Sequence, residues 1–438
     1  MRRTLIQTLG AGGACLLLLA PLAPSLRAAD GNVGDQIVLA IIVSRHGVRA
    51  PLQPNEALAR YSARAWPEWE VKPAIQTPRG NQLVGYMGDY YRARFMRSGL
   101  LSGDPATDGP LVYIRADNDQ RTIETGRIIG KALVPVGEPD VHPAPGGTFD
   151  PLFQPYRAHV GHPDLQLAEA AVLGRLGGDP QSIDAAFAPQ LAELRGILWG
   201  GAPAQGPLAE GEHSRVSEGT KHYLVSISGP IQAAEVCVDG FILEYADGKA
   251  DADVGWGKVD GKVLTDLLAL HDFFFDLADR TYYLAQVNGS NLASHIVDTL
   301  EQAASGDPVP GAIGPSGEKI VVLAGHDSNL ASLGGLLGMN WWIPGTQMNP
   351  TLPGSALVFE LWRKGGEKDA YFVRTSYVSG TLEQLRTAAP LSLASPPALA
   401  PIFIPGCGGD APNFDATLPD FIRQARKVIA PSFTEAEP

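Results

Sequence analysis

The chain has 438 residues, of which 45% are hydrophobic and 18% charged, so it can bury a sizeable core in one large or two ordinary domains. Its formal net charge of −13 argues against nucleic acid and against an anionic membrane surface as partners. No apolar run of twenty residues occurs in the body of the chain, which excludes a membrane-spanning helix there.

The N-terminus has the pattern of a secretory signal. Arg2 and Arg3 precede an apolar stretch at residues 9–22, and small residues follow as far as Ala29. We therefore predict that residues 1–29 are a signal peptide cleaved near Ala28 or Ala29, and that the protein is periplasmic or secreted. A membrane anchor is the less favoured alternative, because the apolar stretch is short and contains proline.

The first predicted strand covers residues 36–44 and is apolar and rich in β-branched residues, as expected for a strand buried on both faces of a parallel sheet. It ends at Arg45-His46, and Arg49 follows closely. Such a loop lies at the carboxyl edge of the sheet, where open α/β folds bind ligands. Two guanidinium groups beside an imidazole suit a tetrahedral anion, above all phosphate. A solvated turn is the alternative interpretation.

The remaining elements alternate between strands and helices at both ends of the chain. A helix is predicted at residues 78–97, a strand at 111–116 and a helix start after Asp117 that carries Arg121 in its first turn. A Pro- and Gly-rich stretch covers residues 134–163, and mainly helical segments, including 228–245 and 261–278, extend to about residue 280. Further predicted elements are a helix at 294–304, a strand at 318–324, a helix at 330–337, strands at 356–362 and 371–377, and a helix at 418–429.

This order predicts an α/β fold: a large α/β domain with a central, mostly parallel sheet flanked by helices, interrupted by a smaller inserted α-helical domain. We expect the α/β domain at residues 30–155 and 281–438 and the inserted domain at residues 156–280.

Two strands far apart in sequence each end in a histidine loop, Arg45-His46 and His326-Asp327. If both belong to one parallel sheet, the two loops meet at one edge and share a ligand. We then expect His46 to be the nucleophile that forms a phosphohistidine, and Asp327 to protonate the leaving group and then activate water. The expected phosphate-binding residues are Arg45, Arg49, Arg121 and His326.

Neither a metal ion nor any other cofactor is predicted. No cysteine or histidine pair has the spacing of zinc ligands. After removal of the signal peptide only Cys237 and Cys407 remain, and a disulfide between them is the minor alternative, because Cys237 lies in an apolar helical pattern typical of a buried free thiol.

The motifs RHGVRAP at residues 45–51 and GHDSN at 325–329 resemble the histidine acid phosphatase family, in particular its bacterial periplasmic phytases and glucose-1-phosphatases. The similarity extends over nearly the whole mature chain through shorter motifs: WPEW (66–69), TPRG (77–80), ADNDQRT (116–122), FDPLF (149–153), VGWG (254–257) and PGSALVFELW (353–362). The resemblance implies a metal-independent acid phosphomonoesterase with a phosphohistidine intermediate. Its phosphate-binding core matches all six candidate site residues without a substitution.

The outer pocket departs from the phytase pattern. Leu52 and Gln53 stand where related phytases often carry a lysine, and residues 286–288 lack an arginine that those enzymes carry nearby. Ser328 replaces a threonine found in many phytases. The substrate therefore stays open between phytate and a sugar phosphate such as glucose 1-phosphate.

Two other functions remain as alternatives. A non-catalytic phosphate- or phosphosugar-binding protein could use the same pocket, although a carboxylate beside a bound phosphate, as Asp327 would be, does not favour binding alone. The pair His326-Asp327 also permits a metal-dependent HD-type phosphohydrolase, which would need further His and Asp ligands. The expected partner is in each case a small phosphate compound, and the oligomeric state has no signature in the sequence.

Overall fold

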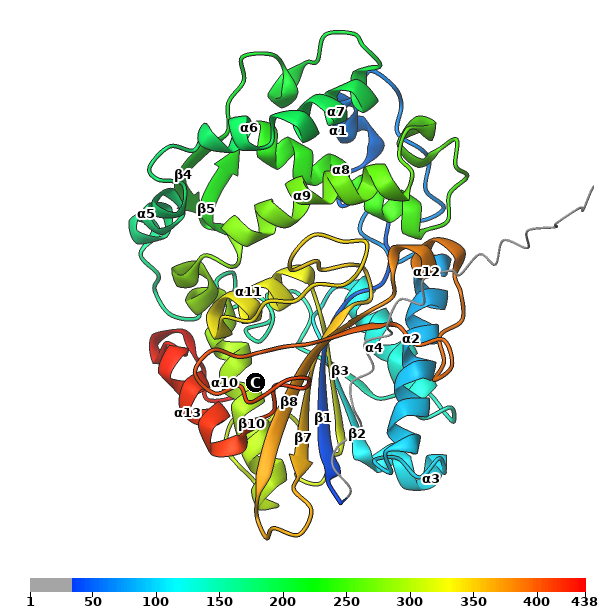
Figure 1. The fold of residues 1–438 in the computed structure, drawn as a ribbon, viewed down its shortest axis with the longest axis vertical. Coiled ribbons are helices and arrows are strands. Elements are labelled where there is room, and N and C mark those ends of the chain that lie inside the picture. The colour runs from blue at the N-terminus through cyan, green and yellow to red at the C-terminus, as the bar shows by residue number, and fades with distance from the viewer. Residues whose placement is uncertain (1–33) are drawn as a thin grey trace, which may run out of the picture.

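The computed structural model describes residues 34–438, and the predicted signal peptide lies outside the described residues. An eight-stranded sheet forms the centre of the molecule, with strand order β10-β8-β7-β1-β6-β2-β3 and β9 paired with β8 (Figure 1). Its strands are β1 (Gln36–Arg45), β2 (Val112–Ala116), β3 (Val141–Pro143), β6 (Ile320–Gly325), β7 (Ala356–Arg363), β8 (Tyr371–Ser379), β9 (Ala398–Pro401) and β10 (Ala416–Thr417).

The sheet has a parallel half and an antiparallel half. Strands β1, β6, β2 and β3 pair in parallel, whereas β7 is antiparallel to β1 and to β8, and β9 and β10 are antiparallel to β8. The α/β class is confirmed, and the predicted parallel arrangement holds for the strands that carry the candidate site. Strand β8 follows β7 after a short connection, residues 364–370, which permits only a hairpin.

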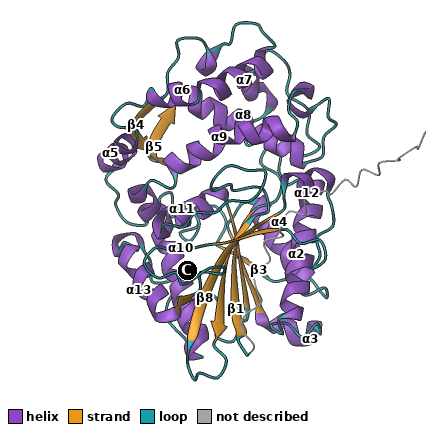
Figure 2. Cartoon of the chain, in the orientation of Figure 1, coloured by secondary structure: helices purple, strands orange, loops and turns teal. Residues whose placement is uncertain are grey.

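Helices cover both faces of the sheet (Figures 1 and 2). Alternate residues of β1 pack into different cores: Ile41 and Val43 into one, Ala40 and Ile42 into the other, which confirms that the strand is buried on both faces. The helices that flank the sheet are α2 (Pro78–Arg97) and α4 (Gln120–Leu133) on one side, and α10 (Tyr282–Ser305), α11 (Asp327–Leu337) and α13 (Leu418–Val428) on the other.

A second group of elements lies beyond one end of the sheet, the end near which α11 lies (Figure 1). It contains α5 (Leu165–Arg175), α6 (Ser182–Ala186), α7 (Ala188–Trp199), α8 (Pro230–Ala246) and α9 (Gly261–Ala278), together with the hairpin β4 (Arg215–Thr220) and β5 (Tyr223–Ser228). The hairpin was not predicted, because most residues of β4 are exposed and the strand lacks an apolar face. The short helices α1 (Asn55–Leu58), α3 (Pro105–Asp108) and α12 (Leu382–Thr387) complete the α-helices of residues 34–438. The boundaries of an inserted domain at residues 156–280 stay a prediction.

Within residues 34–438 both cysteines are free thiols, Cys237 buried in α8 and Cys407 half-buried, so the disulfide alternative is wrong. Within residues 34–438, none of the helices combines the length and the apolar character needed to cross a bilayer.

Candidate active site

The two histidine loops meet at one edge of the sheet. Arg45 ends β1 and is paired in parallel register with Gly325, which ends β6. The next residues, His46 and His326, lie with their ring centroids 5.6 Å apart, edge to face at 74°. The sequence prediction that segments about 280 positions apart converge is therefore confirmed by the geometry.

Two glycines make this close approach possible. The amide of Gly47 donates to Gln76 Oε1 and Thr125 Oγ1, at 3.0 Å each, and a side chain there would place its Cβ 2.7 Å from a methyl group of Val84. At Gly325 a Cβ would lie 2.5 Å from Asn329 Oδ1. A side chain fits at neither position. Because glycine has none, the backbone of each loop can pass close to its neighbours, and the two loops can lie side by side.

His46 is buried and has a defined hydrogen-bond arrangement. Its Nδ1 lies 2.8 Å from the carbonyl oxygen of Gly47, so in the neutral ring Nδ1 carries the proton and donates it to that carbonyl. Nε2 then keeps a free lone pair. Burial, together with the charges of Arg121, Arg45 and Arg49, lowers the pKa of His46 well below its usual value. The imidazole is therefore neutral in mildly acidic solution.

One carboxylate joins two of the predicted arginines. Asp239 of α8 accepts from Arg45 Nη2 through Oδ1 (3.3 Å) and from Arg49 Nη2 through Oδ2 (3.1 Å). Burial opposes ionisation of Asp239, but the two guanidinium groups outweigh it and lower its pKa. Arg45, completely buried, also donates to the carbonyl oxygen of Thr351. The two guanidinium groups thus lie together on one carboxylate, an arrangement suited to binding an anion.

Arg121 reaches the same edge from the first turn of α4, as predicted. Its Nη2 lies 2.8 Å from Asp119 Oδ2 and 3.5 Å from His326 Nδ1. The N-terminus of α4 adds the positive end of a helix dipole to this part of the site.

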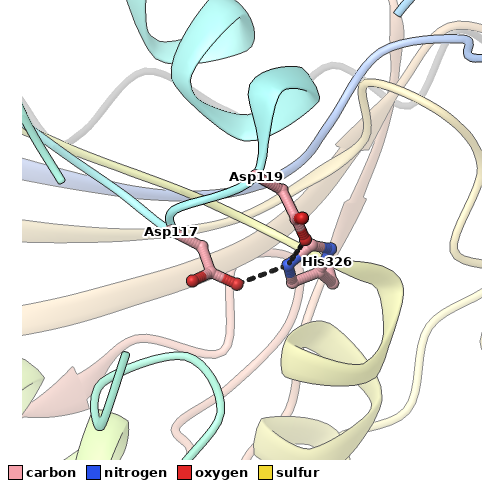
Figure 3. Close-up of side chains that lie close together, drawn as sticks. All are labelled: Asp117, Asp119 and His326. Atoms are coloured by element: carbon pink, nitrogen blue, oxygen red, sulfur yellow. Dashed lines mark hydrogen bonds and ion pairs between the residues drawn. The ribbon is translucent and has the colours of Figure 1, made fainter. Parts of the chain in front are cut away.

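A buried carboxylate holds His326 in place (Figure 3). His326 Nε2 lies 2.6 Å from Asp117 Oδ2 and 3.5 Å from Asp119 Oδ2. Asp117 also accepts from the amide of Asn118 (2.7 Å) and from Gln154 Nε2 (2.6 Å). Burial would raise the pKa of Asp117, but these bonds lower it, and the carboxylate therefore stays ionised and keeps a proton on Nε2 of His326.

Asp117, Asp119 and His326 also place their ligand atoms close enough together to hold a metal ion, the one such group found within residues 34–438. A carboxylate pair and an imidazole suit several divalent cations. However, a metal on Nε2 would have to displace the proton that joins His326 to Asp117 (Figure 3). The geometry thus favours a hydrogen-bonded imidazole over a metal ligand.

Asp327 is the first residue of α11 and lies beside Arg45. Its Oδ2 is 3.0 Å from Arg45 Nη2, and its Oδ1 accepts from the amide of Ser328 at 2.8 Å. Burial would raise the pKa of Asp327, but Arg45, His326 and Arg49 outweigh it and lower the pKa to about 2. This carboxyl group is therefore ionised in mildly acidic solution.

All six predicted site residues come together, and further contributors were missed, among them Asp117, Gln154 and Asp239. Asp117 lies in the motif ADNDQRT, which carried a usable signal, since it directly follows β2 at the same edge of the sheet. Gln154 and Asp239 have no comparable signal. Asp239 lies within an apolar helix, and only the packing of α8 against the sheet edge brings it to the arginines.

Comparisons with known proteins identify the family to which the chain belongs. The sequence model of the histidine phosphatase superfamily (branch 2) matches residues 36–154 and 239–378. Phytase AppA of Escherichia coli (strain K12) is 33% identical over 404 residues, which cover 90% of this chain and 92% of that one. A glucose-1-phosphatase of Providencia rettgeri is 28% identical over 421 residues, covering 94% and 96%.

Solved structures show the same similarity. The phytase of Hafnia alvei in complex with tartrate superposes with a TM-score of 0.83 at 33% identity, over 92% of this chain and 100% of that one. The same phytase in complex with myo-inositol hexakis sulphate gives a TM-score of 0.81 at 32% identity, over 92% and 100%. The chain belongs to the histidine phosphatase superfamily, branch 2.

Proposed function

We propose that the protein is an acid phosphomonoesterase that hydrolyses small phosphate monoesters through a phosphohistidine on His46. The observation that carries the proposal is the state of His46: a buried, neutral imidazole whose Nδ1 is bound to the carbonyl of Gly47, beside three arginines. A ring nitrogen with a free lone pair among cationic groups is suited to attack phosphorus. Release of p-nitrophenol and phosphate from p-nitrophenyl phosphate tests the proposal, and a protein that binds phosphate without turnover at pH 3–7 would contradict it.

In the first step, Nε2 of His46 forms a bond to phosphorus while the bond from phosphorus to the ester oxygen breaks. Arg45, Arg49 and Arg121 bind the non-bridging oxygens and stabilise the charge of the transition state. His326 adds a further donor through its Nδ1 when the ring is protonated. The leaving alkoxide takes a proton from Asp327.

In the second step, a water molecule attacks the phosphohistidine. Asp327, now ionised, accepts a proton from this water, and the phosphoryl group moves from Nε2 to the water oxygen. Inorganic phosphate leaves, and His46 returns to the neutral state. The two steps use the same carboxyl group first as an acid and then as a base.

We assign the proton on Asp327 to the substrate. A phosphate monoester loses its second proton near pH 6, as phosphoserine does, so below that pH it arrives as a monoanion. The arriving phosphate also competes with Asp327 and Asp239 for Arg45, and the weakened ion pair together with the negative charge of the phosphate raises the pKa of Asp327. Transfer of one proton from the bound monoanion to Asp327 then gives the reactive complex.

We expect the activity to persist at a pH at which an ordinary histidine is protonated. Because the pKa of His46 is lowered, kcat/KM for p-nitrophenyl phosphate should not fall as the pH decreases from 6.5 towards 4.5, and it should decrease above about pH 6 as the substrate loses its second proton. Initial rates between pH 3 and pH 8 measure this profile. A decline that begins near pH 6.5 on the acidic side would contradict a neutral His46.

Removal of metal ions should leave the rate unchanged, because the proposed reaction uses only side chains. Dialysis against EDTA, followed by the p-nitrophenyl phosphate assay with and without added Mg²⁺ or Zn²⁺, checks this expectation. Loss of activity on dialysis and its recovery with metal would instead favour the metal-dependent alternative at Asp117, Asp119 and His326.

The finer assignments are also part of the proposal. The relatives are named as phytases and glucose-1-phosphatases, which supports phytate or a sugar phosphate as substrate class. A periplasmic or secreted location depends on the signal peptide predicted at residues 1–29.

A further inference from the structure

A chain of hydrogen bonds leads from His326 to an arginine that the proposed reaction does not use. His326 Nε2 lies 2.6 Å from Asp117 Oδ2, and the same oxygen accepts from Gln154 Nε2, also at 2.6 Å. Gln154 Oε1 in turn accepts from Arg157 Nη1 at 3.2 Å. Arg157 is therefore joined to a candidate phosphate-binding residue through two side chains that lie between them.

The chemistry of its two partners fixes the orientation of the Gln154 amide. The ionised carboxylate of Asp117 only accepts hydrogen bonds, so it must face the amide nitrogen. The guanidinium group of Arg157 only donates hydrogen bonds, so it must face the amide oxygen. Exchange of the two ends of the amide would place donor against donor and acceptor against acceptor. Gln154 thus has one arrangement, in which the cation polarises the amide and strengthens its bond to the carboxylate.

The bond from Gln154 also affects which carboxylate holds His326. Asp117 is completely buried, its Oδ1 accepts from the amide of Asn118 at 2.7 Å, and its Oδ2 accepts from Gln154, so both oxygens are anchored. Asp119 Oδ2 is a competitor that lies 3.5 Å from the same nitrogen of His326 (Figure 3). Without the bond from Gln154, Asp117 can rotate and the imidazole can turn towards Asp119. Such a turn would also move Nδ1, the nitrogen that the reaction uses.

Contacts with the β4–β5 hairpin hold Arg157. Its Nε donates to the carbonyl oxygen of His222 in the turn of the hairpin, at 3.3 Å. Its guanidinium carbon lies 5.3 Å from the ring centroid of Tyr223 and 5.6 Å from that of Phe149, within the range of cation–π interactions. The hairpin belongs to the second group of elements, so this chain of contacts joins that group to the catalytic edge of the sheet.

The charge of Arg157 is not neutralised by a carboxylate of its own. Both hydrogen-bond acceptors of its side chain are neutral oxygens. Among residues 34–438, no carboxylate lies within ion-pair distance of this guanidinium group, in contrast to Arg45, Arg49 and Arg121. The first carboxylate reached along its hydrogen bonds is that of Asp117, so the cation acts on the network that holds the histidine.

We propose that Arg157 and Gln154 are positioning residues that hold His326 in the orientation that the phosphatase reaction needs. They act through Asp117 and touch none of the reacting atoms. This inference rests on the proposed phosphatase function and extends its machinery to the turn of the β4–β5 hairpin. Loss of either residue should therefore slow the chemical steps, while the three arginines of the site still bind the phosphate.

The experiment measures kcat and KM for p-nitrophenyl phosphate, and the inhibition constant of inorganic phosphate, in Gln154→Met and Arg157→Met. Methionine keeps an unbranched side chain but removes the hydrogen bonds. We expect kcat to fall about tenfold or more in Gln154→Met, and about threefold or more in Arg157→Met, which lies one hydrogen bond further out. The inhibition constant and KM should change by less than about threefold, because phosphate binding is retained.

A double-mutant cycle shows whether Gln154 acts through Asp117. In Asp117→Asn, which removes the carboxylate, the further change Gln154→Met should lower kcat by less than about twofold, because members of one hydrogen-bonded chain are not additive. Thermal unfolding checks that each variant folds. If Asp117→Asn does not fold, His326→Ala serves as the background, with the same result expected.

The matched control is Arg64→Met. Arg64 lies 5.0 Å from the ring centroid of Trp256 and donates to the carbonyl oxygen of Ile197 at 3.0 Å. It therefore makes the same kinds of contact as Arg157, but within residues 34–438 its side-chain contacts do not lead to Asp117. Its replacement should leave kcat unchanged. An equal loss of kcat in Arg64→Met and Arg157→Met would overturn the role of Arg157.

The possible failures are distinguishable. If the wild type does not hydrolyse p-nitrophenyl phosphate, the phosphatase reaction is wrong, and the positioning role falls with it. If the wild type is active but Gln154→Met keeps kcat within about twofold of it, or if the effects in the cycle multiply, the positioning role is wrong and the phosphatase function stands. The same conclusion follows if phosphate binding weakens as much as kcat falls.

Discussion

Replacement of His46 by alanine should lower kcat for p-nitrophenyl phosphate by at least about 10⁴-fold, because loss of the nucleophile removes the covalent route as a whole. The neighbouring arginines would still bind the substrate in this variant, so binding of inorganic phosphate should persist. Steady-state rates and equilibrium dialysis with labelled phosphate measure the two effects separately.

Trapping of the intermediate gives an independent check on His46. Wild-type enzyme, mixed with ³²P-labelled substrate and quenched within milliseconds in alkali, should retain label with the alkaline stability of phosphohistidine, and His46→Ala should retain none. Near-normal turnover in the alanine variant, or labelling at another residue, would remove His46 as the nucleophile.

The second large effect is expected at Asp327. The change Asp327→Asn keeps the shape of the side chain and the hydrogen bond from Ser328 but removes the proton that the leaving group needs. For an alkyl phosphate such as glucose 1-phosphate we expect kcat to fall by about 10²–10⁴-fold. For p-nitrophenyl phosphate the loss in the phosphorylation step should be much smaller, because p-nitrophenolate leaves without a proton.

Hydrolysis of the phosphohistidine also needs Asp327 as a base, so the comparison requires the rate of the first step. A burst of p-nitrophenol followed by slow turnover would show that phosphorylation is fast and dephosphorylation slow in Asp327→Asn. Equal losses for both substrates in the first step would contradict the role of Asp327 as a general acid.

Much of the active site could be predicted because its residues lie at the ends of recognisable strands. The apolar runs before Arg45 and His326 indicate buried parallel strands, and the carboxyl ends of such strands meet. Arg121 could be assigned because it lies in the first turn of a helix that follows a strand. The positions of these residues therefore depend on local sequence and on one topological rule.

The residues that were missed depend on long-range packing. Asp239 reaches Arg45 and Arg49 because the helical segment folds back over the sheet edge, and nothing in an apolar helix predicts which polar residue faces that edge. The antiparallel half of the sheet and the β4–β5 hairpin were missed for a related reason, since strand direction and exposed strands leave weak patterns. The ionisation of Asp327 could not be predicted either, because it is set by the guanidinium group 3.0 Å away.

The loop after β1 also decides which alignment of the strands is stable. Strand β1 is apolar on both faces, so its hydrophobic contacts would tolerate a shift by one residue relative to β6 far better than those of a one-sided strand. The amide of Gly47 donates to Gln76 and Thr125, and the amide of His46 donates to the carbonyl of Gly325, so these polar contacts together favour one alignment. Deletion of a single residue within β1 should therefore strain or break these polar contacts while leaving the apolar core largely intact. The polar contacts of the loop after β1 thus help to set the register of the central sheet.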